Sequence, residues 1–326
     1  MSQDAASATS ASRLQHMPVA FFAMIMGTAG LTLSWQKASH VLGQPLQISQ
    51  LLLILAVCLF LTVVISYGLK IKRFPEMVLK EFNHPIKISF FPAFSIGMLL
   101  ISVATLEVSR SLSLILWLAG AALHLGFTIH VMTQWIHHPK FQVQHSTPAW
   151  FIPVVGNVIV PIAGVEHGFT EISWFFFSIG LVYWLVLKTL IFNRFLFHEP
   201  LPEKLLPTLF ILIAPPAVGF ISYMKLNGGE LDSFARVLYY AALFLVLLLS
   251  SQIMRFAKIR FYLSWWAYSF PLAAFSIATQ TVYAQTGSIG LLLLSYFSLI
   301  VCTLVIGLLL YKTFIAVRSG DLFQPD

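Results

Sequence analysis

Long apolar runs, separated by short polar stretches, dominate the chain. Ten runs reach about the 20 residues that an α-helix needs to cross a bilayer. The predicted spans are Met17–Trp35, Gln50–Leu69, Ser89–Leu106, Leu112–Val131, Thr147–Val165, Trp174–Phe192, Leu205–Met224, Val237–Ile253, Phe261–Tyr283 and Gly290–Tyr311. We therefore expect an all-α membrane protein with ten transmembrane helices in one domain, residues 16–315. A disordered tail, residues 1–15, precedes it, and a short tail, residues 316–326, follows.

Composition excludes a soluble globular protein. Hydrophobic residues make up 58% of the 326 and charged residues 10%, whereas soluble domains carry about 25% charged residues. Cys58 and Cys302 both lie inside apolar runs, so no disulfide framework is expected. The sequence has no zinc motif, phosphate-binding loop or nucleophile elbow. We expect no metal, no cofactor and no enzymatic activity.

The positive charges lie mostly on one side of the predicted spans. Tails and loops on the side of the N-terminus carry 14 Lys and Arg residues, and the opposite side carries 4. Because Lys and Arg concentrate in cytoplasmic loops, both termini are expected in the cytoplasm. This asymmetry accounts for the net charge of +7 without a nucleic-acid partner. We expect the chain in a bacterial inner membrane.

Prolines divide the ten spans into two populations. They lie inside or at the start of the odd-numbered spans, and the even-numbered spans have none: Pro18, Pro85, Pro92, Pro148, Pro153, Pro161, Pro207, Pro215, Pro216 and Pro271. Proline removes a backbone donor and clashes with the preceding turn, so a helix kinks or breaks there. Broken backbone at membrane depth is tolerated only within protein or beside a water-filled cavity. The odd spans are therefore expected inside the bundle.

The spacing of these prolines predicts a repeat. The kink positions Pro92, Pro153, Pro215 and Pro271 follow one another at intervals of 61, 62 and 56 residues, the length of one helical hairpin. Because every hairpin contains two spans, all five run in the same direction. This favours five parallel hairpins in a quasi-five-fold ring, with kinked odd helices lining a central pore. A solid bundle whose prolines only shape the helices is the alternative.

The expected pore lining carries no fixed charge. The apolar stretches of the odd spans contain no Asp, Glu, Lys or Arg, and their polar residues, such as Ser95, Asn157 and Ser269, are neutral. Proton-coupled transporters usually need an ionisable relay within the membrane, so tight proton coupling is disfavoured. Neutral hydroxyls and the positive ends of half-helices hold anions weakly, and weak sites permit conduction.

Two stretches resemble a known family. Residues 265–271, Trp-Trp-Ala-Tyr-Ser-Phe-Pro, are similar to the ninth-helix signature of the tellurite-resistance/dicarboxylate transporter family, which includes bacterial TehA and the slow anion channels of plant guard cells. Residues 17–27 resemble its first helix, with Ala23 where that family often has glycine. Weaker similarity covers residues 148–157 and 213–215.

The resemblance implies a membrane channel that passively conducts small anions, usually as a homotrimer in the lipid bilayer. It places the gating phenylalanine at Phe270, directly before the kink of the ninth span. The other candidate pore residues are Phe91, Ile152 and Ala214 at the equivalent position of other repeats, together with Ala23, Gly27, Ser95, Asn157 and Ser269. A secondary transporter or exporter of tellurite, sulfite or C4-dicarboxylate anions is the alternative.

Overall fold

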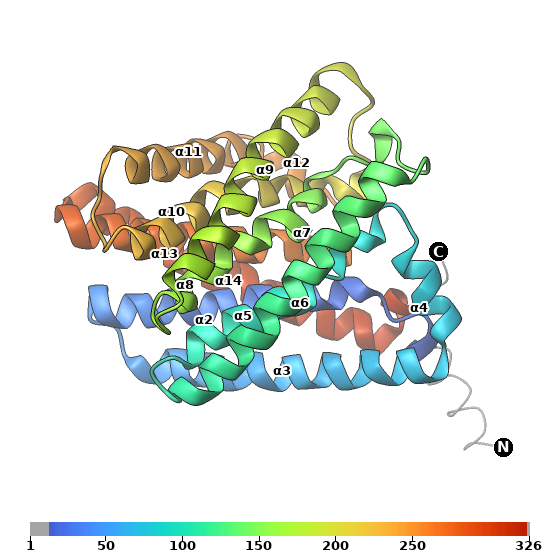
Figure 1. The fold of residues 1–326 in the computed structure, drawn as a ribbon, viewed down its shortest axis with the longest axis horizontal. Helices are drawn as coiled ribbons and strands as arrows, with labels where there is room; N and C mark the ends of the chain where they lie inside the picture. Colours follow the sequence, from blue (N-terminus) through green and yellow to red (C-terminus); the bar gives the residue numbers. More distant parts are fainter. Residues whose placement is uncertain (1–12, 325–326) are drawn as a thin grey trace.

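The computed structural model describes residues 13–324 (Figure 1). Within this range the chain forms α-helices and short 3₁₀ helices, with no β-strand. The predicted N-terminal tail lies outside the described residues except for positions 13–15, and so do the last two residues of the predicted C-terminal tail. The described part of that tail begins inside a helix, because α14 extends to Ser319.

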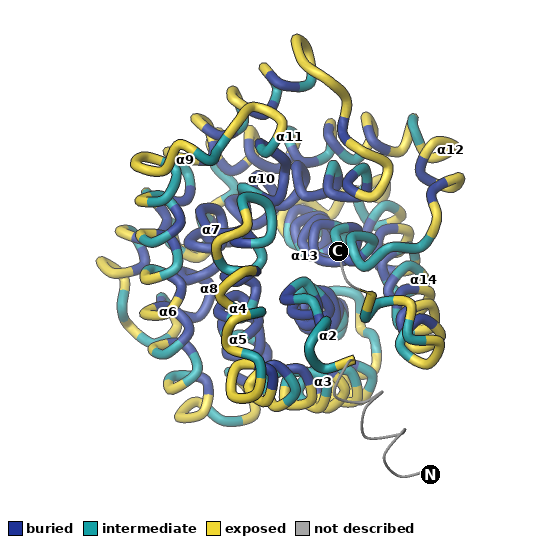
Figure 2. Tube along the Cα trace, turned by 90° about the vertical axis from the view of Figure 1, so that its right-hand side faces the viewer, coloured by how far each residue is buried: buried dark blue, intermediate teal, exposed yellow. Residues whose placement is uncertain are grey.

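Five long helices form the outside of the molecule. They are α3 (Leu46–Arg73), α6 (Arg110–His137), α9 (Thr170–Phe197), α11 (Ser233–Ser250) and α14 (Ile289–Ser319). Only 22–33% of the residues in their most apolar stretches are buried in the protein. Figure 2 shows the exposed residues on these helices facing outward. Apolar side chains exposed in this way have the acyl chains of a bilayer as their natural solvent.

The inner helices form a closed ring. They are α2 (Phe22–Leu42), α5 (Ala93–Thr105), the pair α7 (Phe151–Val155) and α8 (Val160–Gly164), α10 (Ala214–Leu226) and α13 (Ser269–Thr286). Each contacts the next in the order α2, α5, α8, α10, α13, and α13 contacts α2 again. In Figure 2 these helices are largely buried and are surrounded by the outer five.

Each inner helix starts as a 3₁₀ helix and continues as an α-helix. The 3₁₀ segments are η1 (Val19–Phe21), η2 (Lys87–Phe90), η4 (Pro148–Trp150), η6 (Glu203–Ile213) and η7 (Leu263–Tyr268). Pro92 directly precedes α5, and Pro153, Pro215 and Pro271 lie within the first three residues of α7, α10 and α13. The first turn of an α-helix accepts proline because its N–H groups have no partner there. The prolines therefore stand where one helix type changes to the other.

Among residues 13–324, eight helices are long and apolar enough to cross a membrane. The fifth and ninth predicted spans are not among them. The fifth, Pro148–Gly164, is a shorter apolar stretch that η5 (Gly156–Ile159) separates into α7 and α8. The ninth consists of η7 and α13, and α13 carries many hydroxyl and amide side chains that lower its hydropathy.

Short helices complete the fold at the end of the ring where the 3₁₀ segments begin. They are α4 (Pro75–Phe82), α12 (Ile253–Phe256), η3 (Val143–His145) and η8 (Asp321–Phe323). The η8 segment returns to the start of the first inner helix, where the ring of Phe323 stacks on Phe21 with centroids 5.9 Å apart. Both ends of the described chain therefore meet at this side of the ring.

Helices α2 and α13 approach closely because α2 presents two glycines to α13. A Cβ atom at Gly27 would lie 2.6 Å from Cβ of Ser269 and 3.0 Å from the Trp266 ring. A Cβ atom at Gly30 would lie 3.0 Å from Cβ of Ala273 and 3.3 Å from the Phe270 ring. The segment that carries Phe270 is thus fixed against α2.

We expect Gly27→Ala to lower the stability of the protein, since the added methyl group overlaps Ser269. Overpacking of this kind costs about 1–3 kcal/mol, which should lower the midpoint of thermal unfolding in detergent. Gly126→Ala is the matched control, because a Cβ atom there, on the exposed side of α6, meets no atom within 4 Å. Equal midpoints for the two variants would contradict the close contact between α2 and α13.

Candidate functional site: two cavities that share Phe270

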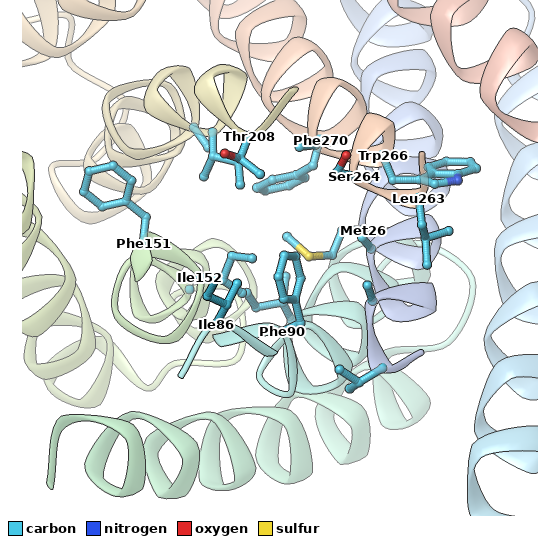
Figure 3. A pocket seen from close by; sticks show the side chains of 18 of the residues that line it. Met26, Ile86, Phe90, Phe151, Ile152, Thr208, Leu263, Ser264, Trp266 and Phe270 are labelled. Carbon is cyan, nitrogen blue, oxygen red and sulfur yellow. The ribbon is translucent and has the colours of Figure 1, made fainter. Parts of the chain in front are cut away.

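A cavity of about 370 Å³ opens among the first halves of the inner helices. We call it the α4-side cavity, because Glu81 of α4 lies in its wall. Apolar side chains make up most of the lining (Figure 3). Polar side chains occur in the wall at Glu81, His84, Lys87, Lys204, Thr208, Tyr262 and Ser264.

A second cavity, of about 580 Å³, lies at the other ends of the same helices. We call it the Lys37-side cavity. Its wall includes Leu33, Gln36, Lys37, His40, Leu100, Val103, Glu107, Ile162, Glu166, Ile221, Lys225, Ala274, Ile277, Thr281 and Gln285. It is therefore more polar in composition than the α4-side cavity.

Two residues, Phe270 and Val218, line both cavities. In Figure 3 the ring of Phe270 projects from α13 into the α4-side cavity, opposite Met26 and Phe90. Its exposed fraction is only 8%, and that of Val218 is 2%. An aromatic ring and a branched aliphatic side chain thus border both cavities, which lie toward opposite ends of the inner helices.

Several residues predicted from the sequence come together here. Ala23, Ile152 and Ala214 line the α4-side cavity with Phe270. Of the kink prolines, Pro215 and Pro271 also line it, whereas Pro92 and Pro153 line neither cavity. The members of this group come from α2, α7, α10 and α13, so four of the inner helices contribute to the site.

Phe91 lies outside both cavities, and its neighbour Phe90 lines the α4-side cavity instead. The Phe91 ring packs edge-on against Phe82, with centroids 4.8 Å apart, and against Tyr67, at 6.2 Å. It therefore joins the inner helix to α3 and α4. Phe91 and Phe270 both directly precede a kink proline, but their rings point in different directions relative to the cavities.

The predicted polar candidates turn away from the cavities and bind backbone carbonyl groups at the helix breaks. The Ser95 hydroxyl donates to the Pro92 carbonyl at 2.8 Å, the Asn157 amide to the Val154 carbonyl at 2.8 Å, and the Ser269 hydroxyl to the Trp266 carbonyl at 2.6 Å. Each acceptor is three residues earlier in the chain. Gly27 also lines neither cavity, since it packs on Ser269.

Sequence reasoning missed a buried ion pair beside the α4-side cavity. Glu81 and Lys70, 7% and 2% exposed, approach to 2.8 Å. The Glu81 carboxylate also accepts hydrogen bonds from the Tyr67 hydroxyl, at 2.8 Å, and from the Val19 backbone N–H, at 3.0 Å. The Lys70 ammonium donates to the Met17 carbonyl at 2.7 Å. These bonds join α3 and α4 to the start of the first inner helix.

His84 lies in the loop after α4 and faces the same cavity. Burial lowers the pKa of His84 below its ordinary value of 6.5, and the positive charges of Lys87 and Lys204 add to this effect. The imidazole is therefore neutral at pH 7. Its protonation, which adds positive charge to the cavity wall, therefore takes place at a lower pH than that of a free imidazole.

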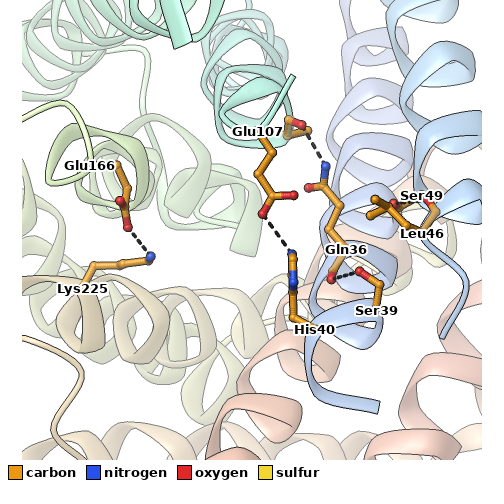
Figure 4. A network of polar contacts seen from close by, with 9 residues as sticks. Gln36, Ser39, His40, Leu46, Ser49, Glu107, Glu166 and Lys225 are labelled. Carbon is orange, nitrogen blue, oxygen red and sulfur yellow. Dashed lines mark hydrogen bonds and ion pairs between the residues drawn. The ribbon is translucent and has the colours of Figure 1, made fainter. Parts of the chain in front are cut away.

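Two pairs of polar side chains lie in the wall of the Lys37-side cavity (Figure 4). His40 and Glu107 approach to 2.9 Å, and Lys225 pairs with Glu166. The first pair joins α2 to the end of α5, and the second joins α10 to the loop after α8. A hydrogen-bonded His–Glu pair and a Lys–Glu ion pair thus connect neighbouring members of the ring.

The sequence pattern of the voltage-dependent anion channel family matches residues 16–314, which include every residue of the two cavities. The chain belongs to this family. It is therefore a multi-pass membrane protein of a family that transports anions.

Similar members come from plants, archaea and bacteria. S-type anion channel SLAH3 of Arabidopsis thaliana is 31% identical over 96% of this chain and 50% of its own length. An uncharacterized transporter of Methanocaldococcus jannaschii is 27% identical over 96% of this chain and 98% of its own. The tellurite resistance protein TehA homolog of Haemophilus influenzae is 23% identical over 94% and 93%. The chain thus spans about half the length of the plant relative.

Proposed function

We propose that the chain is a passive channel for small anions whose pore Phe270 closes. The observation that carries the proposal is that Phe270 borders both cavities, which open at opposite ends of the ring of inner helices. A ring across a narrow apolar neck excludes water and with it hydrated ions. Displacement of this ring would join the two cavities into one path.

The charges near the path support conduction without tight coupling. In both cavities the ionisable residues lie near the ends of the ring, at Glu81, His84, Lys87 and Lys204 on one side and at Lys37, His40, Glu107, Glu166 and Lys225 on the other. Between these two groups, the described residues of the inner helices include no Asp, Glu, Lys, Arg or His. Carriers that couple substrate to protons usually place an ionisable residue there.

The proposed architecture has ten crossings in five parallel hairpins with quasi-five-fold symmetry. The cyclic contacts of the inner helices and the 3₁₀ start that all five share support it. In this arrangement Pro148–Gly164 and Leu263–Thr286 are the fifth and ninth crossings, shielded from lipid by the outer helices. The excess of Lys and Arg on one side supports cytoplasmic termini. A bacterial inner membrane and a homotrimer complete the proposal, on the strength of the family likeness.

A secondary transporter is the competing function, and reversal potentials separate the two. For purified protein in planar bilayers under an anion gradient, we expect the reversal potential to follow the anion gradient alone. A pH gradient added at constant anion concentrations should leave that potential unchanged, because no proton crosses with the anion. A reversal potential that moves with pH would indicate a coupled carrier and contradict the proposed channel.

A further inference from the structure

Among the described residues, Lys37 is a lysine of the Lys37-side cavity that forms no ion pair. Glu166 forms an ion pair with Lys225, and the Glu107 carboxylate lies 2.9 Å from the His40 imidazole. Lys37 is half-buried in the same wall. Across residues 13–324, no acidic side chain lies within 4 Å of its ammonium group, and that group makes no hydrogen bond.

Lys37 stands between the two polar pairs of the wall and the ring of Phe270. Gly30, Lys37 and His40 follow one another along α2 toward the mouth, and Gly30 packs beside Phe270 of α13. At a rise of about 1.5 Å per residue, Lys37 is roughly 10 Å along the helix from Gly30. Leu33, one turn before Lys37, is also in the cavity wall. An ion that enters from this side therefore passes Lys37 before it reaches Phe270.

The surroundings of Lys37 select the kind of ion. An ammonium group taken partly out of water is stabilised by a close negative charge, and no acidic side chain among residues 13–324 lies within 4 Å to supply one. The Glu107 carboxylate lies in the same wall, and its negative charge repels a multiply charged anion more strongly than a singly charged one. The site therefore fits a small monovalent anion of the size of chloride or nitrate.

We propose that the Lys37 ammonium group binds a small monovalent anion in the Lys37-side cavity, one step before the Phe270 barrier. Anion binding at Lys37 does not depend on the proposed channel function, whereas the effect of Lys37 on anion current rests on that function. Two measurements are therefore needed, one of which requires no conduction.

Chloride binding to the purified protein is measured from the broadening of the ³⁵Cl NMR line. We expect Lys37→Gln to remove a protein-dependent part of this broadening, and Lys37→Arg to retain it because the charge stays. Arg236→Gln is the control, since Arg236 is an exposed cation at the start of α11 that lies outside both cavities. Equal broadening in the wild type and Lys37→Gln would overturn the site.

The effect on current is measured in the Phe270→Ala background, with chloride varied on the Lys37 side only. We expect Lys37→Gln to raise the half-saturating chloride concentration about fivefold, which corresponds to roughly 1 kcal/mol of lost attraction. An unchanged half-saturating concentration, or an equal change in Arg236→Gln, would overturn the proposal. If the Phe270→Ala protein carries no current, the proposed channel function is contradicted. The broadening of the ³⁵Cl NMR line still decides whether Lys37 is a binding site.

Discussion

Replacement of Phe270 by alanine is expected to raise anion current at rest by on the order of tenfold or more, since in the proposed channel it removes the ring that excludes water from the neck. The side chain is the largest group common to both cavities, and the only other shared residue is Val218. Without the ring, Val218 is the remaining side chain that borders both cavities, and we expect the neck between them to widen. The measurement is the current of wild type and variant in oocytes or planar bilayers, normalised to protein at the membrane.

Phe90→Ala is the matched control for this experiment. Phe90 is an aromatic residue that lines the α4-side cavity but does not border the second one. Its removal widens one cavity and leaves the neck closed, so we expect the resting current to stay near that of the wild type. A Phe270→Ala protein that is folded, reaches the membrane and conducts no more than the wild type would remove Phe270 from the role of gate.

Removal of the Glu81 carboxylate is expected to give the largest loss of stability. In Glu81→Ala, the Lys70 ammonium stays buried without its counter-ion, and the Tyr67 hydroxyl and Val19 N–H lose their acceptor. Breaking a buried pair from one side costs about 3–5 kcal/mol. A reduced yield and a lower thermal midpoint of the detergent-purified protein are the measurable results.

Two further variants test whether Glu81→Ala loses stability because it leaves a buried charge unpaired, rather than because it removes an ion pair. Lys225→Ala breaks the ion pair between Lys225 and Glu166, in which both side chains are 43% exposed. An exposed ion pair contributes about 0–1 kcal/mol to the free energy of unfolding. The double variant Lys70→Met/Glu81→Leu removes both buried charges and should recover part of the stability that Glu81→Ala loses. If Glu81→Ala unfolds at the same temperature as Lys225→Ala, the buried pair does not hold α4 against the ring.

The breaks in the inner helices could be read from the sequence, because proline has a local and unavoidable effect on the helix. Pro92, Pro153, Pro215 and Pro271 stand where the structure changes from 3₁₀ to α-helix. The place of Phe270 was also accessible, since it directly precedes one of these prolines in the family-like stretch. That the ring borders two cavities required the packed arrangement of all the inner helices.

The orientation of side chains before each proline could not be read in this way. A 3₁₀ helix has 3.0 residues per turn and an α-helix 3.6, so the angle of a residue depends on the length of each segment. The 3₁₀ segment before α5 has four residues and the one before α10 has eleven. Alignment by proline therefore found Ile152 and Ala214 on the cavity but chose Phe91 where Phe90 lies.

The polar candidates show a second limit of the sequence. Ser95, Asn157 and Ser269 are neutral polar residues in apolar spans, the pattern expected of a weak ion site. In the structure each donates to a carbonyl three residues earlier, where the backbone changes helix type. In the membrane, the backbone groups freed at a helix break need hydrogen-bond partners within the protein. The sequence alone does not show whether a polar side chain supplies such a partner or contacts an ion.

The partners of Glu81 could not be predicted for another reason. They come from α3 and from the start of the first inner helix, which are different elements from the α4 helix that carries Glu81.

The close approach at Gly27 and Gly30 has a consequence for how fast the pore can open. A shift of α13 along α2 would drive Ser269 and Ala273 against neighbouring turns, so the backbone of Phe270 has little freedom to move. Rotation about the side-chain torsions of Phe270 needs no such shift. Exposed side chains change rotamer within nanoseconds. Although Phe270 is buried, its ring has a cavity on either side, so we expect its rotation to be faster than the microseconds to milliseconds of collective helix motion. Single-channel records should therefore show brief, flickering openings at rest, and prolonged openings should require a change that separates α2 from α13.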